Sequence, residues 1–99
     1  MNSSFLVRIK YQLKNEQGAI SSISWMLPSQ TAGKKLPYMY TQCEDIACRS
    51  LVPMQDTPAI KITYAAKVRV VNDLTAMMSA NHTQTVAVND THNEYQFKN

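Results

Sequence analysis

The stretch "AIKITYAAKVRVV" (residues 59–71) decides the fold class of this 99-residue chain. Apolar side chains recur at every second position from Ile60 to Val70, and most of the positions between them are polar. A period of two is typical of a β-strand, and polar alternate positions indicate that one face of the strand meets water. The stretch therefore predicts a half-exposed strand.

The same pattern appears upstream. "FLVRIKYQL" (5–13) alternates over its whole length, and "KNEQG" (14–18) supplies turn residues and a glycine. A hairpin into "AISSISWML" (19–27) is expected, ending at Pro28, because proline lacks the N–H that a sheet ladder needs. Residues 29–37 read as a loop, since they contain glycine, proline and small polar residues.

Four shorter segments complete the predicted sheet. They are separated by turn signals and comprise residues 38–41, 74–80, 84–90 and 94–98. Met77 and Met78 also fit a short helix, and that alternative stays open because short apolar runs discriminate poorly. The sum is an all-β domain of about seven antiparallel strands with sandwich-like sheets, and residues 1–99 form one domain.

Composition limits the function. The chain is 44% hydrophobic and 17% charged, as in ordinary globular domains, and carries a net charge of +3. Its ten lysines and arginines are scattered, whereas a nucleic-acid footprint needs a cluster, so we expect surface charge and no nucleic-acid partner. A basic nucleic-acid binder remains a weaker alternative, which salt-dependent retention on DNA would reveal.

Residues 1–12 meet charge after three apolar residues, so they fit neither a secretory signal nor a membrane span. A cytoplasmic chain without a membrane partner, or one whose true start is missing, is expected. Cys43 and Cys48 fit no zinc-finger spacing, and free thiols are expected, although an even count leaves a disulfide open. The glycosylation sequons at 81–83 and 89–91 are interpreted as chance matches without a targeting signal.

A chemically dense cluster, "TQCEDIACR", occupies residues 41–49. From residue types alone it reads as a polar turn, in which Glu44 and Asp45 cap a short helical turn and Arg49 pairs with one of them. This interpretation assigns the cluster no chemistry.

Residues 21–70 carry an ordered set of motifs. They include Trp25, Pro28 with Gln30, Thr31, Gly33 and Lys34, Pro37-Tyr38, Gln42-Cys43, Cys48-Arg49 and Gln55-Asp56-Thr57-Pro58. In this order the motifs resemble the N-terminal β-domain of the zinc aminopeptidases of the aminopeptidase N family, most closely its leukotriene hydrolase branch. The chain would then be a partial domain, with the resemblance strongest over 21–70.

The resemblance implies roles for two residues. In the family, Thr-Gln-Cys-Glu lines the substrate pocket, so Glu44 would bind the α-ammonium of a peptide and Gln42 would lie beside it. The leukotriene hydrolase branch often has Gln at the position of Glu44, so the carboxylate here resembles that of the general aminopeptidases and does not imply epoxide hydrolysis. The family's zinc motif HExxH and its GxMEN strand do not occur. We expect no catalytic residue and no metal ligand here; zinc and the catalytic domain would belong to the parent enzyme.

The remaining candidates have structural interpretations. Trp25 and Tyr38 are expected in the core, Asp56 in a turn where it bonds forward to backbone amides, and His82 and His92 on the surface. The chain alone is expected to be inactive and to self-associate through unpaired edges. A free-standing, non-catalytic β-sandwich that binds peptides or proteins is the alternative function.

Overall fold

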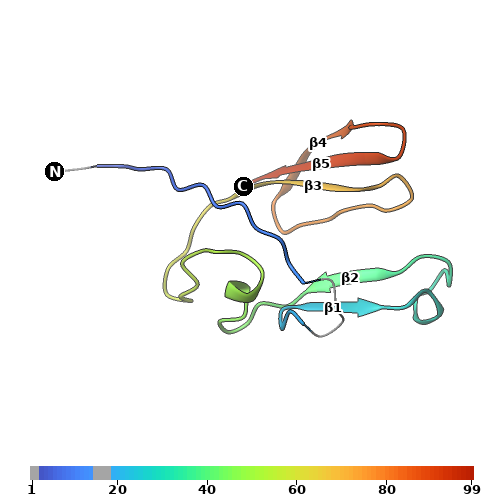
Figure 1. The fold of residues 1–99 in the computed structure, drawn as a ribbon, viewed down its shortest axis with the longest axis horizontal. Coiled ribbons are helices and arrows are strands. Elements are labelled where there is room, and N and C mark those ends of the chain that lie inside the picture. Colours follow the sequence, from blue (N-terminus) through green and yellow to red (C-terminus); the bar gives the residue numbers. More distant parts are fainter. Residues whose placement is uncertain (1–2, 15–18) are drawn as a thin grey trace. The chain divides into compact units, whose positions relative to one another are not determined.

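The structure is a computed structural model that describes residues 3–14 and 19–99 (Figure 1). Within these ranges the chain forms five strands and two single-turn 3-10 helices, η1 (Pro28–Gln30) and η2 (Cys48–Ser50). The strands are β1 (Ile23–Met26), β2 (Tyr38–Thr41), β3 (Ala65–Val71), β4 (Asn81–Ala87) and β5 (His92–Lys98). The chain divides into two units, Met1–Ile60 and Lys61–Asn99. No helix in the described part has the length and apolar character to cross a membrane.

The first unit contains an antiparallel pair, β1 with β2, in which Ile23 lies opposite Thr41 and Met26 opposite Tyr38. The connection between the strands is held by its own side chains. Gln30 Oε1 accepts a hydrogen bond from the backbone N–H of Leu27 at 2.9 Å, and the Thr31 hydroxyl lies 2.8 Å from the carbonyl oxygen of Pro28. The Pro-x-Gln-Thr motif therefore shapes this loop.

The second unit is a three-stranded antiparallel sheet in the order β3-β5-β4. Ala66 lies opposite Phe97 and Val68 opposite Tyr95, so these side chains share one face. Arg69 lies opposite Glu94 on the other face, which is polar. The alternation predicted from residues 59–71 is thus confirmed over β3, where exposed and half-buried residues alternate.

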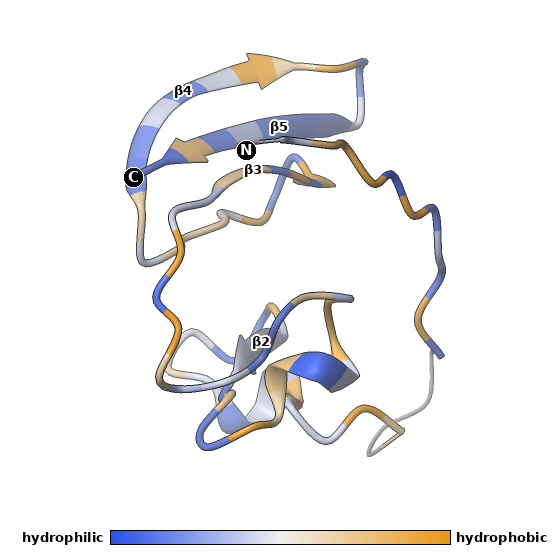
Figure 2. Ribbon diagram, turned by 90° about the vertical axis from the view of Figure 1, so that its left-hand side faces the viewer, coloured by the Kyte–Doolittle hydropathy of each residue, from blue (hydrophilic) through white to orange (hydrophobic). Residues whose placement is uncertain are grey.

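The all-β class with antiparallel sheets is confirmed, but two predicted strands are absent. Residues 5–13 form no strand and residues 74–80 form neither a strand nor the alternative short helix. The predicted turn at 14–18 lies largely outside the described residues. Phe5 and Leu6 are 88% and 85% exposed, and Figure 2 shows that apolar and polar residues follow one another along this segment. Alternation alone makes no strand without a hydrogen-bonding neighbour.

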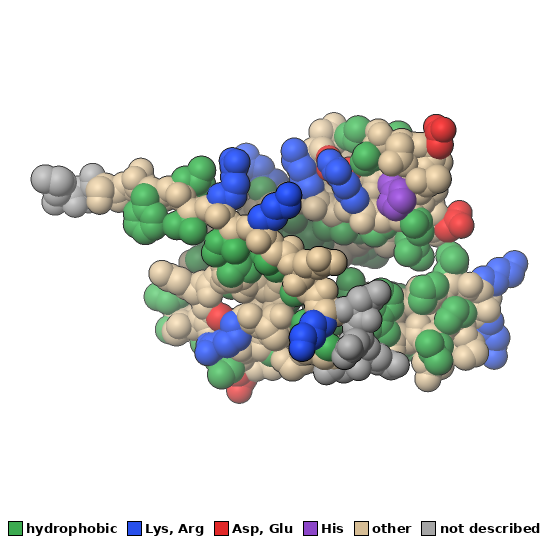
Figure 3. Space-filling model, in the orientation of Figure 1, with side chains coloured by type: hydrophobic (Ala, Val, Ile, Leu, Met, Phe, Trp, Pro, Cys, Tyr) green, Lys and Arg blue, Asp and Glu red, His purple; other side chains and the backbone are tan. Residues whose placement is uncertain are grey.

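The core is smaller than the composition suggests. Among the described residues, the buried apolar side chains are Ala80 and Phe97, and many apolar side chains lie at the surface (Figure 3). The expectation that Trp25 and Tyr38 are core residues is wrong, because they are 48% and 55% exposed. They belong to a two-stranded sheet with four residues per strand, which is too small to cover its own faces.

Candidate functional site

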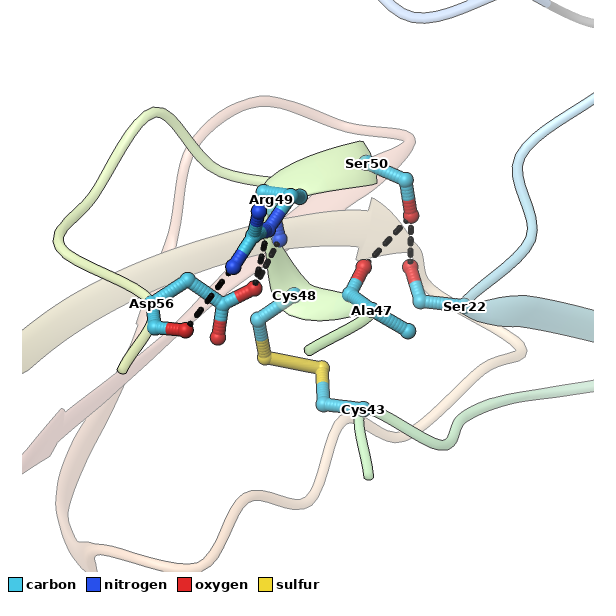
Figure 4. Close-up of a disulfide and its surroundings, with 7 residues drawn as sticks. All are labelled: Ser22, Cys43, Ala47, Cys48, Arg49, Ser50 and Asp56. Atoms are coloured by element: carbon cyan, nitrogen blue, oxygen red, sulfur yellow. Dashed lines mark hydrogen bonds and ion pairs between the residues drawn. A yellow bond between two sulfur atoms is a disulfide. The ribbon is translucent and has the colours of Figure 1, made fainter. Parts of the chain in front are cut away.

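The cluster at 41–49 begins at Thr41, the last residue of β2, and is fixed to Ser22, the residue before β1. The backbone N–H of Gln42 donates to the carbonyl oxygen of Ser22 at 2.8 Å, which extends the β1–β2 pairing by one bond. The Ala47 N–H then donates to the carbonyl of Cys43 at 2.8 Å and turns the chain back on itself. The segment leaves the sheet and reverses within a few residues (Figure 4).

A disulfide between Cys43 and Cys48 closes this turn, so the expectation of free thiols is wrong. The cause is the reversal at Ala47, which brings the two Cα atoms to 4.7 Å. That separation lies within the range that a disulfide requires. The spacing of five residues gives no indication of this geometry, because an extended chain of that length would hold the sulfur atoms far apart.

A pair of serines ties Ser50, the residue after the cluster, to Ser22, the residue before β1. The Ser50 hydroxyl lies 2.8 Å from the Ser22 hydroxyl and 2.6 Å from the carbonyl oxygen of Ala47. A hydroxyl carries one proton, so Ser50 cannot donate both hydrogen bonds. One is donated by Ser50 and the other by Ser22. Ser22 is only 1% exposed and its hydroxyl is satisfied. Nothing in the sequence distinguishes Ser22 from its serine neighbours, and it was missed for that reason.

Arg49 is engaged by Asp56 and by neither Glu44 nor Asp45. The Asp56 carboxylate accepts hydrogen bonds from the Arg49 backbone N–H at 2.8 Å and from Nε at 3.2 Å. The Arg49 Nη2 donates to the carbonyl oxygen of Asp56 at 3.1 Å, so the two residues form a closed pair (Figure 4). The alternative in which Arg49 neutralises the acidic end of the cluster is therefore wrong, as is the forward-bonding turn expected for Asp56.

Glu44 and Asp45 do not cap the helical turn either. The residue before η2 is Ala47, and no side chain caps that turn. Gln42, Glu44 and Asp45 are exposed, and their side chains have no hydrogen bond or ion pair within the described residues. Among the described residues the loop therefore presents two carboxylates without partners, Glu44 and Asp45, together with the exposed amide of Gln42. Its framework is held by the disulfide and the Ser22 contacts.

The same unit has a shallow, mostly apolar hollow of about 230 Å³ between β1, η1 and β2. It is lined by Met26, Gln30, Thr31, Ala32 and Tyr38. Gln42 and Glu44 are not among these residues, so the hollow is separate from the acidic loop.

The described residues do not fit a zinc ion. They contain no group of three His, Cys, Asp or Glu side chains close enough to hold a metal. The cysteines are joined in a disulfide and are not thiolate ligands. His92 is the first residue of β5, whereas His82 lies in β4 opposite Phe97, near the other end of β5. The two histidines are therefore far apart.

A second charged arrangement lies on the polar face of the three-stranded sheet. Arg69 Nε donates to Glu94 Oε1 at 2.9 Å, and the Gln96 amide donates to Oε2 at 2.9 Å. The hydrogen bond from Arg69 and, to a smaller extent, that from Gln96 lower the pKa of the Glu94 carboxyl. Both carboxylate oxygens are occupied, so Glu94 stabilises the sheet rather than offering a binding site.

Several known proteins are similar to this chain. Leukotriene A-4 hydrolase of Xenopus laevis is 48% identical over 60 residues, which cover 61% of this chain and 10% of that protein. Aminopeptidase B of Rattus norvegicus is 44% identical over 73 residues, which cover 74% of this chain and 11% of that protein. Leucine aminopeptidase 2 of Sclerotinia sclerotiorum is 47% identical over 49 residues, covering 50% and 8%.

The chain thus spans about a tenth of the length of these curated relatives. The resemblance inferred from the motifs at 21–70 is confirmed by these similarities. Residues 2–99 match the peptidase M1 N-terminal domain, and the chain therefore belongs to that family.

Proposed function

We propose that this chain is part of a zinc metallo-aminopeptidase and that Glu44, with Gln42 beside it, binds the α-ammonium group of the peptide substrate. The observation that carries the proposal is the uncommitted carboxylate of Glu44. It is exposed and has no cationic partner in the described residues, while the guanidinium of Arg49 is held by Asp56. The resemblance of residues 41–44 to the Thr-Gln-Cys-Glu pattern of the family supports the proposal for the same residues.

A carboxylate suits this task on chemical grounds. An enzyme that removes N-terminal residues must distinguish a chain end from an internal residue, and the cationic amine is what an N-terminus alone possesses. A charge-assisted hydrogen bond from that amine to Glu44 is stronger than one between neutral groups. It also fixes the scissile carbonyl one residue from the anchor, which lowers the entropic part of the barrier.

The framework supports such a role because it limits where Glu44 can move. Glu44 lies within the disulfide-closed turn, and the residues that flank this turn, Gln42 and Ser50, both bond to Ser22. A binding group on a loop with fixed ends loses less conformational freedom on binding than one on a free loop. Glu44 would be the anchor and Gln42 a polar neighbour that accepts or donates a hydrogen bond.

The chemical step would belong to the rest of the enzyme. A zinc ion held by the parent enzyme would polarise the scissile carbonyl and activate water. The described residues of this chain contain no group of three side chains that could hold it. The partners implied are therefore a catalytic domain, which would close the pocket over Glu44, and a peptide with a free N-terminus.

The test uses the full-length enzyme with Glu44→Ala and Asp45→Ala as a matched pair. Both changes remove one exposed carboxylate from the same turn, but only Glu44 is the proposed anchor. Loss of a charged hydrogen bond worth about 1.5–3 kcal/mol should lower kcat/KM for free aminoacyl substrates by about 10–150-fold, with zinc content unchanged. Equal effects of the two substitutions, or unchanged kinetics in Glu44→Ala, would refute the assignment.

A further inference from the structure

The turn between β4 and β5 carries the sequence Asn89-Asp90-Thr91 in an exposed position. The Asn89 side-chain oxygen accepts three hydrogen bonds. They come from the Thr91 N–H at 2.8 Å, the Thr91 hydroxyl at 2.9 Å and the His92 N–H at 2.9 Å. The Nδ2 atom of Asn89 has no hydrogen-bond partner within the described residues. The oxygen is fully used and the nitrogen is free.

The turn is also fixed to its surroundings through backbone groups. The Val88 N–H donates to the carbonyl of His92 at 3.1 Å. Asn72 donates to the turn twice, from Nδ2 to the carbonyl of Asp90 at 2.8 Å and from its N–H to the carbonyl of Thr91 at 2.8 Å. None of these bonds uses the side-chain Nδ2 atom of Asn89, so a large substituent on Nδ2 leaves the turn intact.

We propose that Asn89 is an N-glycosylation site. Asn-x-Thr is the acceptor sequence, and the modified atom is the side-chain nitrogen. The donor would be an oligosaccharide carried on a lipid pyrophosphate. Nδ2 forms a bond to the anomeric carbon, the bond from that carbon to the phosphate oxygen breaks, and the lipid pyrophosphate leaves with the electron pair. The amide proton passes to a base of the transferase.

The disulfide is a second and independent observation in favour of this site. Structural disulfides form and persist in oxidising compartments such as the lumen of the secretory pathway, and are rare in the cytosol. N-glycans are added in that lumen. The Cys43–Cys48 bond therefore favours an oxidising compartment, in which the sequon would meet the enzymes that add N-glycans.

The second sequon, Asn81-His82-Thr83, differs in its local structure. Asn81 begins β4 and pairs with Lys98, and the Thr83 hydroxyl donates to the carbonyl of Gln96 at 3.1 Å. Those contacts depend on the finished sheet. The contacts of Asn89 reach only two and three residues along the chain, as in an Asx turn, so they can form in a nascent chain before the sheet exists. This difference favours Asn89 as the acceptor.

The experiment expresses the full-length protein in a eukaryotic cell and treats it with a peptide-N-glycosidase, which converts a glycosylated Asn to Asp. We expect Asp at position 89 by mass spectrometry and a shift in electrophoretic mobility. Asn89→Gln and Thr91→Ala should each remove one glycan. Thr91→Ser, which keeps the hydroxyl, should retain it, and Asn81→Gln should leave the glycan at position 89 in place.

An unmodified Asn89 in the wild-type protein would overturn the proposal, as would a glycan pattern that Asn89→Gln does not change. The outcome is independent of the role proposed for Glu44, because the two residues lie in different units and glycosylation is read without any peptidase assay.

Discussion

Reduction of the Cys43–Cys48 disulfide should loosen the turn that carries Glu44. The sequence separation of 5 means that the bond closes a loop of six residues. The loop-closure relation predicts that a cross-link of this size removes about 7.4 cal/mol/K of entropy from the opened chain, which corresponds to about 2.2 kcal/mol at 25 °C. Reduction should therefore lower the free energy of opening the turn by this amount. The Ala47 amide donates to the Cys43 carbonyl, so its hydrogen exchange should become about 40-fold faster after reduction.

Amide hydrogen exchange, followed before and after reduction and in the Cys43→Ser/Cys48→Ser double variant, measures this effect. The Leu74 amide is the internal control, because it donates to the Val71 carbonyl in the unit that has no cysteine. Exchange at Ala47 that is unchanged by reduction would show that the backbone hydrogen bonds alone hold the turn. Alkylation of both cysteines without a reductant would contradict the disulfide itself.

Three further predictions concern the sheet and the exposed surface. Because the pKa of Glu94 is lowered, its stabilising effect is complete above the ordinary value of 4.5 and is lost as pH falls through the lowered value. Glu94→Gln should therefore make the unfolding temperature depend less on pH on the acid side. Phe97→Ala should cost about 3–5 kcal/mol in urea unfolding, whereas Val71→Ala at a position 43% exposed should stay within about 0.5 kcal/mol. The 99-residue chain by itself should form oligomers in analytical ultracentrifugation through its exposed apolar faces, and a monomer that melts cooperatively would contradict this.

The fold could be predicted where a segment's pattern and its partner agree. The strand at 38–41 and the strand at 94–98 were placed correctly, and the alternating faces of residues 65–71 match the sheet. Residues 5–13 show equally good alternation and still form no strand. Alternation is a property of one segment, whereas a strand requires two, and the sequence of the first does not say whether the second is present.

The site shows the same division between local chemistry and tertiary geometry. The sequence places three carboxylates within seven residues of Arg49, at Glu44, Asp45 and Asp56, and spacing alone does not choose among them. The structure chooses Asp56, because the turn closed by the disulfide directs the backbone N–H of Arg49 as well as its guanidinium toward that residue. One carboxylate that receives two donors from one residue is favoured over a carboxylate that could receive only the side chain. This choice determines the charge of the loop: an Arg49 paired with Glu44 would cancel the group proposed to bind the substrate amine, and an Arg49 paired with Asp56 leaves it available.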